Sequence, residues 1–274
     1  MFKLSTQATR LIITLILIFT GCGGSGGSNS SEATSACSLI SLGTKVINGQ
    51  SCAGLNQSPI VRIVLKIEQK YYPICTASMI AADKVLTAAH CFLELPDNLS
   101  EIGIISGELG TARYAKAIDL EIAPGLSVSS GRIFNDISIL TLEKSAELPT
   151  LSLLAGRPIE VGETGYIYGY GVSEIDQAPE SVNFSELNSG TMRIENITSN
   201  HFFVAYNGNG SNVCFGDSGG PLVVIHNNSP AIIGTTSQGT SKNCASGDIT
   251  TFINLQNAEL LNWILLVSPE TQII

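Results

Sequence analysis

The sequence contains little charge and no internal repeat, and these absences exclude several classes of protein. Charged residues make up only 14% of its 274 residues, and the mean hydropathy is +0.27. Such a chain can bury enough apolar surface to fold, which disfavours intrinsic disorder. Without a repeat it is neither collagen nor a coiled coil. A formal net charge of −9 attracts no phosphate backbone, so we expect no nucleic-acid partner.

The chain also lacks an apolar run long enough for a spanning helix of about 20 residues. A basic, acid-free start precedes the short apolar segment 11–19 (LIITLILIF), which is the pattern of a secretory signal. Residues 19–22 (FTGC) then resemble the lipobox of bacterial lipoproteins. This predicts a signal peptide over residues 1–21 and lipidation of Cys22. The alternative is an ordinary signal peptide cut elsewhere, with Cys22 a spare thiol.

Residues 22–45 are predicted to be a Gly/Ser-rich tether and pro-segment. Removal of the signal peptide leaves 12 basic against 23 acidic side chains, so acyl chains alone would hold the protein to an anionic membrane. We therefore expect an exported protein, either lipid-anchored in the bacterial cell envelope or secreted. The membrane would then be a partner, bound through the lipid anchor at Cys22.

The cysteines favour disulfides rather than a metal site. Six follow Cys22, an even number that suits an oxidising compartment: Cys37, Cys52, Cys75, Cys91, Cys214 and Cys244. Their spacing alone leaves the pairing open. No CxxC or Cys/His cluster with zinc spacing occurs, so no metal or other cofactor is expected. No acidic loop has a clear calcium-ligand pattern, and calcium binding stays open.

From residue 46 onward the hydrophobic period is near two, with Gly, Pro, Asn and Ser between short β-branched runs. This predicts an all-β fold of the sandwich or barrel type. Near the end, apolar residues recur at helical spacing and predict one C-terminal helix that packs on the body. The expected strands are 61–67, 74–80, 114–122, 137–142, 165–170, 191–197, 202–206, 222–225, 232–236 and 249–253.

Three short motifs carry the residues with chemistry. VLTAAHC places His90 after an apolar strand, NDISIL places Asp136 at the start of another, and GDSGGP places Ser218 in a glycine-rich turn. A serine hydroxyl becomes a good nucleophile when an imidazole takes its proton and a buried carboxylate fixes the tautomer of that imidazole. Glycines beside the serine let backbone N–H groups converge on a developing oxyanion. The other histidines, His201 and His226, are interpreted as structural.

In this order the three motifs resemble those of trypsin-like (chymotrypsin-fold) serine proteases, over residues 46–274. The resemblance implies two antiparallel six-stranded β-barrels with the active site between them. It implies a serine endopeptidase that acts on protein or peptide substrates through an acyl-enzyme. His90 would be the general base and then acid, Asp136 its orienter and Ser218 the nucleophile. The N–H groups of Gly216 and Ser218 would form the oxyanion hole.

The resemblance also implies disulfide pairs. Cys75 would pair with Cys91 behind the histidine, and Cys214 with Cys244 beside the substrate pocket. The family frequently joins the position of Cys52 to a cysteine in the second barrel, but this chain has none there. We therefore expect Cys52 to pair with Cys37, a bridge that by loop entropy contributes about 3 kcal/mol.

Lys45-Val46-Ile47-Asn48-Gly49 is similar to the activation site of the family, which implies a zymogen. After cleavage behind Lys45, the new ammonium of Val46 would pair with Asp217, whose buried carboxylate is otherwise uncompensated. This pairing would set the Gly216 N–H in place. The alternative is that Lys45 is a solvated linker residue.

The substrate-binding residues implied by the resemblance are Asn212, Ser237, Gly239 and Asp248. Asn212 stands where an Asp would select Lys or Arg, and it offers an uncharged amide. Asp248 at the pocket wall would attract a cationic side chain, although a shift of one residue would place Gly247 there. The pattern predicts a broad or moderately basic preference. A neutral pocket, with Asp248 turned to solvent, is the alternative.

The sequence also departs from the family, and two other functions compete. Tyr170 and Gln238 stand where tryptophans are common, and Gln238 would replace a flat apolar wall of the cleft. A catalytically silent protease-like binding module requires a lost triad member, and none is lost here. An α/β-hydrolase esterase is disfavoured because the G-x-S-x-G elbow is absent and the His-Asp-Ser order is wrong for it.

Overall fold

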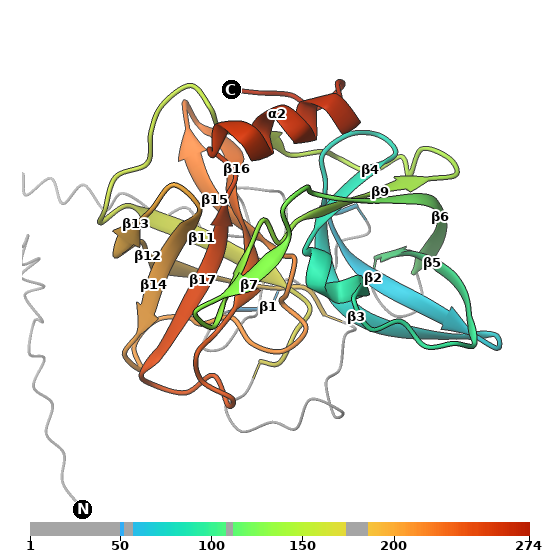
Figure 1. Cartoon of the computed structure of the whole chain (residues 1–274), viewed down its shortest axis with the longest axis horizontal. Helices are drawn as coiled ribbons and strands as arrows, with labels where there is room; N and C mark the ends of the chain where they lie inside the picture. The colour runs from blue at the N-terminus through green and yellow to red at the C-terminus, as the bar shows by residue number, and fades with distance from the viewer. Residues whose placement is uncertain (1–49, 52–56, 108–111, 174–185) are drawn as a thin grey trace, which may run out of the picture. The chain divides into compact units, whose positions relative to one another are not determined.

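The computed structural model describes residues 50–51, 57–107, 112–173 and 186–274 (Figure 1). The predicted signal peptide (1–21) and most of the N-terminal segment that follows it lie outside these residues. Within the described part, no helix has the length and apolar character needed to cross a membrane. The strands pair antiparallel except for one short parallel pair, so the predicted all-β class is confirmed.

The first half of the described chain forms a closed six-stranded barrel. Around the barrel the order is β2 (Ile60–Ile67), β3 (Lys70–Met79), β4 (Lys84–Thr87), β9 (Ser138–Leu142), β6 (Arg113–Ile122) and β5 (Leu99–Ser106). Pairing of β5 with β2 closes it. Alternate side chains on these strands point inward, and Val61, Ile63, Ile104 and Leu140 form part of its core. This barrel matches the prediction.

The second half forms a curled half-barrel. Its strands follow the order β1 (Gln50–Ser51), β12 (Asn188–Arg193), β11 (Thr164–Gly169), β15 (Pro221–His226), β16 (Ser229–Gln238), β17 (Asp248–Asn254), β14 (His201–Tyr206) and β13 (Asn196–Ile197), and β10 (Ser152–Leu153) pairs with β16. Among the described strands this path is open. β1 and β13 lie at its two edges, so the second of the two predicted barrels is present as a curled half-barrel.

A two-stranded hairpin lies between β6 and β9 in the sequence. It consists of β7 (Ser127–Ser129) and β8 (Arg132–Phe134). Its turn residues Ser130 and Gly131 have φ values of 50° and 73°. Two successive positive φ angles give the turn a twist that matches the twist of the flanking strands. The hairpin ends just before the predicted triad residue Asp136.

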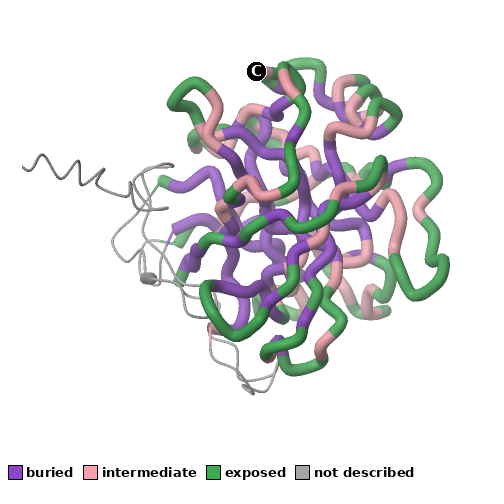
Figure 2. Tube along the Cα trace, turned by 90° about the vertical axis from the view of Figure 1, so that its left-hand side faces the viewer, coloured by how far each residue is buried: buried purple, intermediate pink, exposed green. Residues whose placement is uncertain are grey.

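The predicted C-terminal helix is present as α2 (Ala258–Val267), near the C-terminus in Figure 1. Asn257 caps its start, because the side-chain oxygen accepts hydrogen bonds from two backbone N–H groups of the first turn. Leu260 and Ile264 are buried in an apolar cluster that also contains Leu86 of the first barrel and Ile253 of the second sheet. Figure 2 shows the buried segments running through the interior, with exposed turns around them.

Candidate active site

His90 lies in the short 3₁₀ helix η1 (Ala89–Phe92), which follows β4 directly. The end of β4 is fixed because the buried Thr87 hydroxyl donates a hydrogen bond to the Thr76 carbonyl oxygen at 2.8 Å. The His90 side chain remains 24% exposed. One edge of its ring therefore faces the protein, while another can meet a solute.

Asp136 is fully buried and is bound by His90 at both oxygens. The His90 Nδ1 lies 2.7 Å from Asp136 Oδ2, and the His90 backbone N–H donates to Oδ1 at 2.8 Å. The Ser237 hydroxyl also donates to Oδ2, at 2.6 Å. Burial alone would raise the pKa of Asp136, but the hydrogen bonds and charge of His90 outweigh it, and the pKa lies below its ordinary value. The carboxylate is thus ionised and fixes the imidazole in the Nδ1–H tautomer.

Ser218 lies in a tight turn that backbone contacts fix on both sides. Its carbonyl oxygen accepts the Thr76 N–H at 2.9 Å, and the Gly219 N–H donates to the Thr236 carbonyl oxygen at 2.8 Å. Gly216 and Gly219 have φ values of 93° and 80°, and a Cβ on Gly219 would overlap Thr76. Among the described residues, the N–H groups of Gly216 and Ser218 have no acceptor. Both are therefore available to an oxyanion.

His90 and Ser218 line the same pocket, which has a volume of about 300 Å³. Ser237, Gly239 and Asp248, three of the four residues predicted to bind substrate, line it as well. Phe215, Gln238 and Cys244 are among the other lining residues. Residues of two of the sequence motifs therefore meet at one hollow of the surface, and Asp136 of the third is buried and bonded to His90.

Asp248 and Asn212 form a buried polar pair at this pocket. Asp248 is 1% exposed, and its Oδ2 accepts the Asn212 Nδ2 at 2.9 Å. Its Oδ1 accepts the backbone N–H groups of Thr240 and Ser241, each at 2.7 Å. Asp248, rather than Gly247, lines the pocket, and Asn212 lies behind it. The alternative with Asp248 turned to solvent does not hold.

Asp217 is a completely buried carboxylate without a cation beside it in the described residues. The Gly171 N–H donates to its Oδ1 at 2.8 Å, and the Cys214 N–H donates to its Oδ2 at 2.9 Å. Burial raises the pKa of Asp217 to about 7 against the effect of these two hydrogen bonds. The predicted activation residues Lys45 and Val46 lie outside the described residues.

Two of the predicted disulfides are confirmed. Cys75 bonds to Cys91 and Cys214 bonds to Cys244, which ties the chain on either side of the site. Cys75 and Cys91 also lie near His90, but disulfide sulfurs are not thiolates and offer no metal ligand there. Outside the described residues lie the other cysteines of the prediction, Cys22, Cys37 and Cys52.

The sequence did not reveal that the hairpin before Asp136 is fixed to the second sheet by side chains. The Ile133 N–H donates to Gln238 Oε1 at 2.9 Å, and Gln238 Nε2 donates to the Gly131 carbonyl oxygen at 2.9 Å. His201 Nε2 lies 2.8 Å from the Ile133 carbonyl oxygen. Burial lowers the pKa of His201, which favours a neutral ring that donates from Nε2. Neither Gln238 nor His201 belongs to one of the three motifs. In the sequence, the only indication of these contacts was Gln238 itself, which stands where tryptophan is common.

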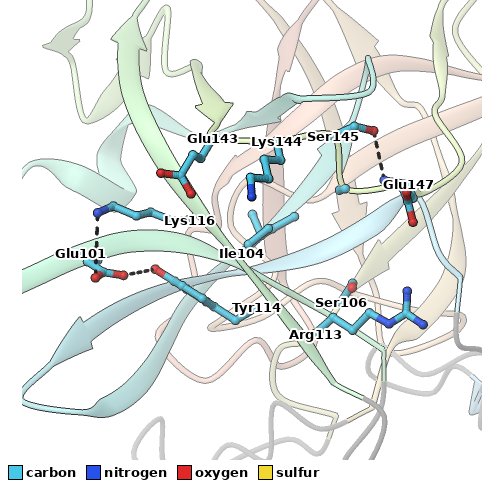
Figure 3. A pocket seen from close by; sticks show the side chains of 12 residues that line it. Glu101, Ile104, Ser106, Arg113, Tyr114, Lys116, Glu143, Lys144, Ser145 and Glu147 are labelled. Atoms are coloured by element: carbon cyan, nitrogen blue, oxygen red, sulfur yellow. Dashed lines mark hydrogen bonds and ion pairs between the residues drawn. The ribbon is translucent and has the colours of Figure 1, made fainter.

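A larger pocket of about 460 Å³ lies at the first barrel, between β5, β6 and residues 143–147 (Figure 3). Its lining carries charges of both signs. Figure 3 shows Lys116 and Tyr114 both directed at Glu101, whose carboxylate accepts the Tyr114 hydroxyl at 3.0 Å. No residue of the three motifs lines this pocket. We therefore assign this pocket no reaction.

Comparison with known proteins gives a consistent result. The family model described as Trypsin matches residues 46–264, which include all three motifs. Trypsin-3 of Salmo salar is 27% identical over 191 residues, which cover 65% of this chain and 77% of the relative. Trypsin I-P1 of Gallus gallus is 26% identical over 193 residues, 65% and 74% of the two chains. CLIP domain-containing serine protease B4 of Anopheles gambiae is 28% identical over 221 residues, 69% and 61% of the two chains.

Proposed function

The chain belongs to the trypsin family and is a serine endopeptidase, and we propose that it cuts peptide bonds with His90, Asp136 and Ser218 as its catalytic triad. One observation carries this assignment. The His90 ring is bound through Nδ1 to a buried carboxylate and lines the same pocket as the hydroxyl-bearing Ser218. Membership of the family implies protein substrates.

In the neutral ring, the proton that Nδ1 shares with Asp136 leaves Nε2 free to accept one. In the proposed reaction, Ser218 Oγ attacks the scissile carbonyl carbon while its proton passes to this nitrogen. His90 then gives the proton to the amide nitrogen as the C–N bond breaks, which leaves an acyl-enzyme. Water then attacks the acyl-enzyme while its proton passes to His90 Nε2. His90 returns this proton to Ser218 Oγ as the acyl bond breaks, which releases the carboxylic acid product. Asp136 stabilises the imidazolium that forms in each half-reaction.

The oxyanion of each tetrahedral intermediate would be bound by the N–H groups of Gly216 and Ser218. Two features support this role, namely the absence of an acceptor for either group in the described residues and the positive φ of Gly216. A preorganised donor of this kind is worth about 2.7 to 4 kcal/mol in the transition state. The buried Asp217 between them would hold the turn in register.

For the primary pocket we propose a broad or moderately basic preference, with Asp248 as its source. Asp248 Oδ1 accepts two backbone N–H groups and the Thr240 hydroxyl, whereas Oδ2 accepts, from the described residues, only the Asn212 amide. One acceptor position of Oδ2 is therefore left for a substrate donor. A buried carboxylate at the lining favours a cationic side chain, and its bonds within the protein moderate that preference. Ser237 and Gly239 would complete the wall.

We further propose that the protein is made as a zymogen and activated by cleavage after Lys45. The support is the buried Asp217, which accepts only two backbone hydrogen bonds in the described residues. The ammonium of a new N-terminal Val46 would supply the missing positive charge. A disulfide between Cys37 and Cys52 would keep the segment from Cys22 attached after the cut.

The N-terminal sequence supports export and lipid anchoring as further proposals. The signal-like residues 1–21 and the lipobox-like Cys22 would place the protease in a bacterial cell envelope, on the periplasmic or outer surface. Without the lipid it would be secreted. Metabolic labelling with a radioactive fatty acid, compared between the parent and Cys22→Ser, would test this directly.

Labelling by a fluorophosphonate tests the catalytic assignment. The full-length protein, intact and cut at Lys45, is treated with the probe, and the labelled peptide is identified by mass spectrometry. We expect Ser218 to be labelled, faster after the cut. Neither Ser218→Ala nor His90→Ala should react, although both should keep the parent melting temperature. A folded, cut protein that does not react would instead indicate a silent binding module.

A further inference from the structure

The buried Asp217 has a neighbour on β12 that no sequence motif reveals. A Cβ added to Gly169 of β11 would overlap Asp217 Oδ1. The Asp217 carboxylate therefore lies on the face of β11 toward which a side chain at position 169 would point. Asn188 of β12 lies directly opposite Gly169 in the antiparallel ladder. Residues opposite each other in such a ladder carry their side chains on the same face, with Cβ atoms about 4.5 to 5.5 Å apart. The Asn188 side chain therefore projects beside Asp217.

Asn188 also has an unused acceptor. The residue is 3% exposed, and its Nδ2 donates to the Glu186 carbonyl oxygen at 3.1 Å. This bond orients the amide, and in the described residues Oδ1 has no hydrogen-bond partner. A buried carbonyl oxygen without a donor costs free energy, so its position next to a buried carboxylate requires an explanation.

The chain that follows the predicted cleavage site runs past this position. In β1, Gln50 pairs with Ser189 and Ser51 pairs with Asn188. Val46 precedes Gln50 by four residues, which span at most about 14 Å. A new N-terminus at Val46 is thus within reach of the buried face that Asn188 and Asp217 share.

We propose that Asn188 Oδ1 and the Asp217 carboxylate together form a binding site for an ammonium group, which the Val46 N-terminus fills after cleavage. The inference rests on the proposed activation after Lys45 and adds a second acceptor to it. An ammonium carries three N–H donors, and the carboxylate and the amide oxygen accept from different directions. Asn188 acts here as a positioning residue, because it holds the group that fixes Asp217 and, through it, the oxyanion turn.

The alkaline limit of activity is the readout that separates this role from mere packing. The ammonium binds only while protonated, so activity is present below its pKa and is lost as the pH rises through that pKa. Asn188→Leu removes the acceptor with little change in volume. In the cut enzyme it should lower the alkaline midpoint of kcat/KM by about 1 to 2 pH units. Ser189→Ala, on the opposite face of β12, should leave the midpoint unchanged.

A second variant tests the placement without any cleavage. In a Lys45→Gln chain that stays uncut, Asn188→Lys puts an ammonium beside Asp217, and we expect activity to appear in the intact protein. Thr191→Lys is the matched control, since Thr191 lies on the same strand but is exposed. Its uncut chain should stay inactive.

The outcomes distinguish this inference from the proposed activation. If the uncut Lys45→Gln chain is fully active without any other change, activation by cleavage is wrong. If activity does require the cut, two results overturn the role of Asn188. One is an unmoved alkaline midpoint in Asn188→Leu. The other is a folded Asn188→Lys chain as inactive as the Thr191→Lys control.

Discussion

Asp136→Asn should abolish activity by way of the wrong histidine tautomer, and the hydrogen bonds of Asp136 show why. Oδ1 accepts a hydrogen bond from the backbone N–H of His90, and this group can only donate. An asparagine must therefore keep its oxygen at this place and put its NH₂ group at the place of Oδ2. There the NH₂ group faces His90 Nδ1 and the Ser237 hydroxyl, both of which donate in the parent. The hydroxyl can rotate, but the ring must move its proton from Nδ1 to Nε2.

With a proton on Nε2, His90 cannot accept the proton of Ser218. The predicted loss in kcat is about 10⁴-fold at neutral pH, which corresponds to about 5.5 kcal/mol of transition-state stabilisation. The KM should change little, because the amide has nearly the volume of the carboxylate and the pocket keeps its shape. Steady-state hydrolysis of a fluorogenic peptide by the cut enzyme gives both constants.

Ser237→Ala is the matched control for this prediction. It removes one donor to Oδ2 but leaves the tautomer of His90 intact, so we expect a loss of no more than about tenfold. Equal losses in Ser237→Ala and Asp136→Asn would show that the tautomer is not the controlling factor. A cut Asp136→Asn enzyme with a kcat near that of the parent would refute the assignment of the base itself.

Three further predictions use other parts of the site. Burial raises the pKa of Asp217 from 3.8 to about 7, so the folded chain favours the protonated form of this side chain. In the uncut Lys45→Gln chain, the stabilisation from this protonation is complete below about pH 4 and is lost as the pH rises toward 7. Urea unfolding at pH 5 and pH 8 should show a loss of a few kcal/mol, and the substitution Asp217→Asn should remove this part of the pH dependence. Asp248→Ala should reduce cleavage after Lys and Arg about 10- to 100-fold in a peptide library, whereas an unchanged profile would remove Asp248 from the pocket argument. Gln238→Ala removes the hydrogen bonds to the Ile133 N–H and the Gly131 carbonyl oxygen. The value of kcat/KM should then fall about 3- to 10-fold for long peptides but not for single-residue esters. Equal losses on both substrates would contradict a role in holding the hairpin.

The strands that the sequence predicted are those with a clear alternation of apolar residues. The longest of the strands absent from the predicted set, β5, contains Gly103 in its middle, and an interior glycine usually weakens a strand pattern. In the structure this glycine is required, because a Cβ there would overlap the carbonyl oxygen of Ala115 and the ring of Tyr114 on β6. The reason for the residue lies on another strand, so no local pattern contains it.

The same limit applies to the pocket. The sequence placed Asn212 and Asp248 near the substrate, but it could not tell which of them faces the hollow. That order depends on a hydrogen bond between residues 36 positions apart. It likewise interpreted Gln238 as a lost apolar wall, whereas the amide bonds the backbone of a hairpin 105 positions away. The motifs were sufficient to place Asn212, Asp248 and Gln238 near the substrate, but they did not predict the hydrogen-bond partners of these side chains.

The two sheets support each other's reactive residues, and this makes the site a single mechanical unit. Thr76, on the first barrel, donates through its hydroxyl to the Gly216 carbonyl oxygen at 2.8 Å and accepts the Tyr170 N–H at 3.0 Å. It thereby holds the turn of Ser218 on the second sheet. In return Ser237, on the second sheet, holds Asp136 on the first barrel. Because each contact crosses between the sheets, a small relative movement would displace the nucleophile and the base together. The motifs specify which groups react, and these crossing contacts set the distance between them.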